Sequence, residues 1–315
     1  MNGITRNTPA TEGQKRENSR FLKEAFQVFQ TKLQTMFGEI NTEDAQRFLD
    51  NGDKFKAYTL KTILDSFRRL SVSDQYKDEE VDSSYGYPDV YRGLKPIGVQ
   101  VDILTEEFNL SLDYVGEFIE KVLPTLSLPE GTDWAAIPSV DAVAKRFFPE
   151  VTDQAEKYYR AVELILEKLG KTRNFHNYRE GEFNTRQLRQ HARTLHALNL
   201  IAETQKGDIL IIPMQYGMRH RGRSVRRARE YFSENEFGFG AFAVCCMAFT
   251  HPERYVKWEE LHTDCPGDEF APGAVGDFSC ATRLDFFGGM LYFGTCPVSD
   301  ARGRFGSVTG FLPQG

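Results

Sequence analysis

Apolar residues recur every three or four positions through most of the first 170 residues, which is the spacing of one face of an α-helix. The pattern predicts helices over residues 21–37, 42–50, 55–70, 112–123, 139–148 and 152–169. In the first of these helices the apolar side consists of Leu22, Phe26, Phe29, Leu33 and Phe37. A polar tail, residues 1–20, precedes them, and we expect it to be disordered.

The last forty residues carry short strands in place of helices. Residues 283–287 and 290–294 meet at Gly288-Gly289, a pair suited to the tight turn of a β-hairpin. Residues 305–312 predict a third strand. We therefore expect an antiparallel meander at the end of the chain.

These patterns divide the chain into a helical N-terminal unit, residues 21–80, a mixed central unit, residues 85–215, and a C-terminal unit, residues 216–315. The polar and acidic residues 71–84 are the candidate linker between the first two units. A chain of 315 residues with 40% apolar side chains can bury sizeable cores. The sequence thus predicts an α+β protein of several units.

The longest nearly apolar stretch, residues 237–249, is too short to cross a bilayer, so we expect no membrane contact. Within it, residues 241–249 predict a buried helix. The five cysteines are concentrated in the last third of the chain and suggest no disulfide framework, which is typical of a reducing compartment. We expect a cytoplasmic protein, and no motif indicates a cofactor.

Charge is distributed very unevenly along the chain. The formal net charge is −6, yet residues 171–229 alone carry thirteen Lys and Arg against four Asp and Glu. Residues 1–170 and 230–315 are correspondingly acidic. A local excess of one sign indicates an anionic partner, which is nucleic acid, a phosphorylated ligand or an acidic protein surface, including the acidic parts of this chain itself.

A basic helix and a hairpin are predicted next to each other in this stretch. Residues 185–199 predict a helix whose polar side includes Arg186, Arg189 and Arg193. Residues 200–204 and 209–212 predict a β-hairpin around a glycine-containing turn.

This order of elements resembles a winged helix-turn-helix module, spanning residues 152–212. The resemblance implies that the arginines of the predicted recognition helix contact bases and that Lys206, in the turn of the wing, contacts phosphate. The alternative is an ordinary α+β unit with a basic helix face exposed to solvent.

The densest basic feature consists of six arginines within eleven residues: Arg219, Arg221, Arg223, Arg226, Arg227 and Arg229. Guanidinium groups so close together repel one another unless they face anions. Phosphate is one candidate, because the guanidinium fork matches it with two hydrogen bonds. Intramolecular carboxylates are the other, and Glu230, Glu234 and Glu236 follow the run directly.

A catalytic or metal site is best sought in a predicted loop that gathers an imidazole, a thiol and three carboxylates: His262, Asp264, Cys265, Asp268 and Glu269. Such groups could bind a divalent metal or supply a nucleophile and a base. Their spacing matches no zinc motif, and turn formation needs the same residue types.

Three hypotheses about function follow. The first is a non-enzymatic binding protein whose basic centre engages nucleic acid. The second is a protein-interaction or homo-oligomeric assembly module, in which the basic centre pairs with acidic surfaces. The third is a metal- or cysteine-dependent enzyme acting at residues 262–269.

Overall fold

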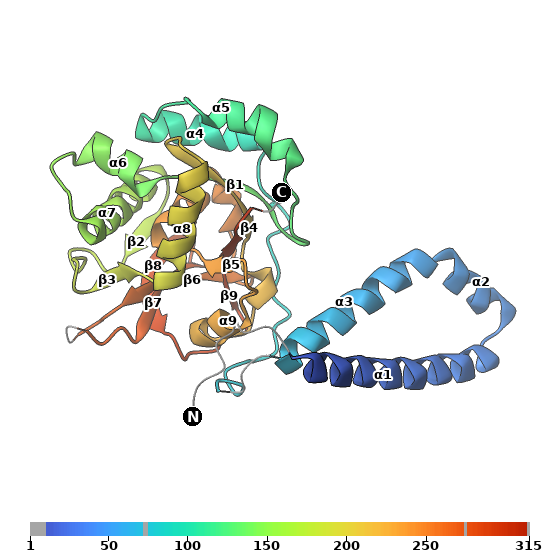
Figure 1. The fold of residues 1–315 in the computed structure, drawn as a ribbon. Helices are drawn as coiled ribbons and strands as arrows, with labels where there is room; N and C mark the ends of the chain where they lie inside the picture. Colours follow the sequence, from blue (N-terminus) through green and yellow to red (C-terminus); the bar gives the residue numbers. More distant parts are fainter. Residues whose placement is uncertain (1–10, 72–74, 274–275, 314–315) are drawn as a thin grey trace. The chain divides into compact units, whose positions relative to one another are not determined.

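The computed structural model describes residues 11–71, 75–273 and 276–313 (Figure 1). The chain divides into two compact units, residues 1–71 and 72–315. Among the described residues there are ten helices and ten strands, and the strands form two sheets. The predicted α+β class is confirmed.

The described part of the first unit contains three helices, α1 (Glu12–Glu39), α2 (Thr42–Asp50) and α3 (Gly52–Ser71). Helix α1 begins earlier than predicted, because Thr11 and Gln14 cap it reciprocally. The expected disorder of residues 1–20 is therefore wrong for residues 11–20, while residues 1–10 lie outside the described part of the chain. Helix α2 has the predicted bounds, and Asn41 caps it.

The second unit contains a four-stranded antiparallel sheet in the order β1-β4-β10-β5. Its strands are β1 (Asp133–Pro138), β4 (Ile209–Gln215), β10 (Thr309–Phe311) and β5 (Glu236–Gly238). Every residue of β4 is buried; β1 pairs along one edge of the strand, and β10 pairs with Met214 and Gln215 on the other edge.

The second sheet runs β2-β8-β7-β6-β3, and β9 also pairs with β6. The bounds are β2 (Phe175–Asn177), β3 (Leu188–Gln190), β6 (His262–Phe270), β7 (Cys280–Phe287), β8 (Met290–Pro297) and β9 (Phe305–Ser307). The predicted hairpin at Gly288-Gly289 is confirmed by the antiparallel pairing of β7 with β8.

The meander is also present, but β6, β7 and β8 form it. The predicted third strand, residues 305–312, is wrong as a continuous strand, because it divides at Val308. Its first half, β9, runs parallel to β6, and its second half, β10, joins the other sheet. This short segment therefore links the two sheets.

Helices surround the strands of this unit in Figure 1. They are α4 (Ile97–Phe108), α5 (Val115–Glu117), α6 (Val140–Phe147), α7 (Gln154–Thr172), α8 (Ala192–Thr204), α9 (Val225–Tyr231) and α10 (Ala241–Thr250), with shorter helical turns at Phe118–Val122, Leu123–Thr125, Met218–His220 and Pro252–Arg254. Helix α10 is buried at nine of its ten residues, as its apolar sequence predicts, and it packs on α7.

The predicted recognition helix and wing are not formed as expected. The segment assigned to one helix, residues 185–199, contains strand β3 and the beginning of α8. The predicted hairpin is wrong, because residues 200–204 continue α8 and residues 209–215 pair with β1 and β10. The buried residues of α8 recur at helical spacing up to Ile201. This spacing therefore outweighs the local β-propensity of Leu200-Ile201. The winged-helix resemblance is unconfirmed.

Candidate functional site

The arginine run meets carboxylates of its own chain. Arg226 forms an ion pair with Glu79, and its Nε lies 2.9 Å from both carboxylate oxygens. Arg227, with only 5% of its side chain exposed, binds Glu80 at 2.7 Å. Glu80 also lies 3.4 Å from Arg223. Two adjacent glutamates therefore pair with three arginines of the run.

Backbone contacts hold these glutamates in place. The Val81 amide donates to the Gly222 carbonyl, and the Ser224 amide donates to the Glu79 carbonyl. Gly222 has φ +78°, and a Cβ there would lie 2.2 Å from the Val81 oxygen, so this approach requires glycine. The acidic end of the predicted linker is thus bound along the arginine run.

Glu236 is the centre of a second ionic cluster. Its buried carboxylate lies 3.2 Å from Arg219 and 2.7 Å from His220, and it accepts the Thr309 hydroxyl at 2.7 Å. Burial alone would raise the pKa of Glu236, but the neighbouring His220, Arg219 and Thr309 groups lower it to about 2. Burial lowers the pKa of His220. Glu236 is therefore an ionised internal partner.

The other two arginines of the run bind backbone oxygens. Arg229 donates to the carbonyls of Pro266 and Asp268 at 2.9 and 2.6 Å, and burial lowers its pKa. Arg221 is exposed and donates to the Tyr85 carbonyl. All six arginines consequently have a partner within the chain, and four of them pair with carboxylates.

Two of the other predicted basic residues, Arg189 and Arg193, lie near the run and also have partners within the chain. Arg193 donates to the carbonyls of Ser233 and Glu236, and Arg189 pairs with Glu269 at 2.8 Å. Arg186 and Lys206 are exposed. Helix α8 has 13 residues, so about 20 Å separates its start near Arg193 from Lys206 beyond its end.

The predicted reactive loop is strand β6, so its side chains alternate between two faces. The loop assignment is wrong, since Thr263, Asp264 and Cys265 pair with β7. Both nitrogens of His262 bind the backbone, one the Trp258 carbonyl and the other the Phe286 amide. Burial lowers the pKa of His262 to about 4. This histidine is neutral and structural.

The remaining candidates of that segment have separate environments. Asp264 lies 3.5 Å from Arg302 and accepts the Cys296 thiol, whereas Cys265 is fully buried on the other face. Burial raises the pKa of the Cys265 thiol, which disfavours a nucleophilic thiolate. Across the described ranges, no three His, Cys, Asp or Glu side chains are grouped to hold a metal ion.

Asp268 holds the beginning of the buried helix α10. Its carboxylate accepts the Ala241 amide at 2.7 Å and the hydroxyls of Tyr158 and Thr282. Burial raises the pKa of Asp268 to about 6, although these three donors and Arg229 oppose the shift. The carboxylate is enclosed by protein, so its surroundings indicate a structural cap for α10.

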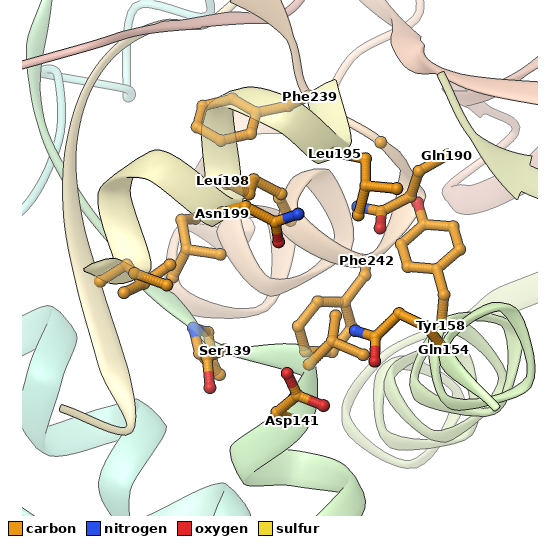
Figure 2. A pocket seen from close by; sticks show the side chains of 17 residues that line it. Ser139, Asp141, Gln154, Tyr158, Gln190, Leu195, Leu198, Asn199, Phe239 and Phe242 are labelled. Atoms are coloured by element: carbon orange, nitrogen blue, oxygen red, sulfur yellow. The ribbon is translucent and has the colours of Figure 1, made fainter. Parts of the chain in front are cut away.

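Tyr158 also lines a pocket. It has about 600 Å³ of empty space, including its open mouth, and lies between the end of β1 and helices α6, α7, α8 and α10. Figure 2 shows the side chains of Gln154, Gln190 and Asn199 around this space. Sequence reasoning missed the pocket, because its three carboxamides come from distant segments and follow no motif.

The first unit presents a different kind of surface. None of the described side chains in residues 11–63 is buried. Phe26 exposes 49% and Met36 58% of its surface, although both lie on the apolar side of α1. Among the described side chains, rings contact one another at the turn, where the ring centroid of Phe48 lies 4.8 Å from those of both Phe37 and Phe55. The three described helices therefore leave much of their apolar surface uncovered.

Comparisons with known proteins give no assignment: no family model, curated protein or solved structure matches the chain. Among the described helices, none combines the length and the apolar content needed to cross a membrane.

Proposed function

We propose that this chain is a non-enzymatic assembly protein that associates with a second copy of itself through the apolar face of α1. The observation that carries the proposal is a helical unit without a described buried side chain. Helices in water gain most of their stability from packing an apolar face. The unit therefore needs an additional surface to cover that face.

The spacing of the exposed residues favours another helix as this surface. Leu22, Phe26, Phe29, Leu33 and Met36 alternate in steps of four and three. This heptad spacing is typical of a coiled-coil seam, in which each apolar side chain inserts between four residues of the facing helix. Helix α1 has 28 residues and carries the whole seam.

Self-association is the simplest way to cover the exposed apolar seam of α1. A second copy presents the same stripe with the same length and spacing, and a twofold arrangement brings one stripe onto the other. Residues 11–71 carry eleven Lys and Arg and nine Asp and Glu, so no strong charge repels a second copy. The arginine run does not supply the contact in this proposal, because its glutamates are intramolecular.

Size-exclusion chromatography with light scattering on the full chain tests the proposal. The wild type should have at least twice the 36.0 kDa mass of one chain, and it should keep that mass at high salt. Phe26→Glu together with Phe29→Glu should give a single chain. Gln27→Glu together with Thr31→Glu adds the same charge on the opposite side of α1 and should leave the assembly intact.

A wild type that is monomeric at high micromolar concentration would overturn the proposal. So would an assembly that survives the two phenylalanine substitutions, or one that both pairs of substitutions dissolve equally. An assembly that dissociates only at high salt would favour the basic–acidic pairing expected from the charge map instead.

Nucleic acid is the second candidate ligand, and the exposure of Arg186, Arg221 and Lys206 favours it. The 260/280 nm absorbance ratio in the same chromatography experiment reports any nucleic acid that co-purifies. A protein carrying nucleic acid that high salt releases would favour this candidate.

A further inference from the structure

We propose that the pocket between α7, α8 and α10 is a binding site for a small uncharged ligand that carries amide-like hydrogen-bonding groups. This inference is independent of the assembly proposal, because every residue that lines the pocket lies in the second unit. It rests on the floor of the pocket, on the side chains around its opening and on its charge.

The floor of the pocket is apolar and rigid. Ile137 of β1, Leu210 of β4 and the rings of Phe239 and Phe242 line it, and all four residues are buried in the core. Neighbouring strands and helix α10 fix their positions. Such a floor offers a ligand apolar contact without a cost for ordering the side chains, as in typical small-molecule sites.

Three carboxamides stand around this floor, each on a different element. Gln154 is the first residue of α7, Gln190 the last residue of β3, and Asn199 lies in α8. Within the described part of the chain, these side-chain amides form no hydrogen bond with another residue. Figure 2 shows them around the same space, so each can offer a donor and an acceptor to a bound molecule.

The charges at the pocket favour a neutral ligand. No Lys or Arg lines it, and its one acid, Asp141, already binds Lys157 at 2.7 Å. Helices α6, α7 and α10 begin nearby, and helix N-termini attract anions. Ser139, Asp153 and Asp268 already cap these three helices, however. A charged ligand would thus lose its hydration without gaining a counter-ion.

The chemical class follows from these features. Carboxamides recognise groups that place a donor beside an acceptor, as in primary amides and the lactam edges of heterocyclic bases. The apolar floor requires that the rest of the ligand, opposite this amide-like edge, is compact and has little polarity. We therefore expect a ring-sized molecule whose one polar edge is amide-like.

Three probes of similar shape and different charge test the site: benzamide, benzoate and benzamidine, with uracil as a lactam. Saturation-transfer NMR titrations on the full chain should detect benzamide and uracil, and binding of benzoate and benzamidine should be at least about tenfold weaker. Asn199→Leu should weaken benzamide binding by at least about fivefold. His196→Leu, at an exposed position of α8 outside the pocket, is the matched control and should bind as the wild type does.

A second variant, Ala202→Leu, places a larger side chain in the pocket without removing an amide, and it should also weaken benzamide binding. Circular dichroism establishes that each variant is folded. The proposal would be overturned if the wild type bound neither benzamide nor uracil. Equal binding of the charged probes, or benzamide binding unchanged in both Asn199→Leu and Ala202→Leu, would overturn it as well.

Discussion

Two buried carboxylates show that neighbouring residues determine whether a buried acidic side chain is ionised. Glu236 contacts Arg219 and His220, and its pKa is about 2. The side-chain carboxylate of Asp268 accepts hydrogen bonds from uncharged groups, and burial raises its pKa to about 6. Folding therefore favours the ionised form of Glu236 and the protonated form of Asp268.

Asp268 consequently makes stability fall as pH rises. A carboxyl group whose pKa is raised from 3.8 to about 6 binds more protons in the folded than in the unfolded chain between these values. Its contribution should decrease by about 2.4 kcal/mol from pH 4 to pH 7, since one pKa unit corresponds to about 1.4 kcal/mol and pH 4 already lies slightly above the unfolded pKa. Asp268→Asn should remove this component. Urea unfolding at several pH values measures it, and parallel curves for the two proteins would contradict the assignment.

Sequence could identify these residue types but not their roles. His262, Asp264, Cys265, Asp268 and Glu269 are adjacent in sequence, which suggested one reactive loop. The pairing of β6 with β7 is irregular between Cys265 and Phe270, so it sets the directions of these side chains and separates them. Such an irregularity depends on the partner strand, which local spacing does not reveal.

At the scale of elements, glutamine side chains act as substitutes for neighbouring strands. Strand β1 is at the edge of its sheet, and Gln100 of α4 donates to its Trp134 carbonyl and accepts its Ala136 amide. Gln205, just after α8, pairs in the same way with both backbone groups of Ile211 in β4. These side chains satisfy strand groups that would otherwise be buried without partners.

Gln100→Leu should therefore destabilise the second unit by about 2–4 kcal/mol. The apolar replacement fills a similar volume but leaves one carbonyl and one amide of β1 buried and unpaired, and each such group costs about 1–3 kcal/mol. Urea unfolding followed by fluorescence gives the change. Gln154→Leu, at an exposed position, is the control and should change stability little. Equal stabilities of the two variants would show that the edge contact is dispensable.

Elements with a strong local pattern could be predicted, whereas those defined by distant pairing could not. The α2 bounds, the buried helix α10 and the Gly288-Gly289 hairpin were predicted, since each has a helix period, an apolar run or a turn pair within a few residues. Residues 200–204 fit a strand or a helix equally well locally. Their helical state follows from packing within the unit, which accounts for the wrong hairpin.

For the second unit as a whole, the contact that pairs the opposite charges joins segments far apart in sequence. Glu79 and Arg226 are separated by 147 positions, and Glu79 and Glu80 pair with three of the six arginines of the run. The sequence showed the opposite charges and left open whether they pair internally or bind a partner. Only the path of residues 79–83 beside Gly222 and Ser224 distinguishes the two in this structure.

This contact predicts a latent affinity for nucleic acid. Glu79→Gln together with Glu80→Gln should remove the carboxylate partners of Arg223 and Arg226, whereas Arg227 keeps Glu230 at 3.5 Å, and it should raise affinity for single-stranded nucleic acid at low salt. The slope of log affinity against log salt should steepen by about 1.4, because each additional phosphate contact on a single strand adds about 0.7. Fluorescence anisotropy across a salt series measures both quantities.

The control is Glu43→Gln with Asp44→Asn, which makes the same change in net charge on α2, away from the run in sequence. If only the Glu79 and Glu80 variant gains affinity, the glutamates occupy a surface that phosphate can bind. Equal gains in affinity for both variants would show that the change in net charge alone causes the effect. A wild type that already binds as tightly as the Glu79 and Glu80 variant would contradict a stable internal pairing, because its arginines would then exchange their carboxylates for phosphate without hindrance.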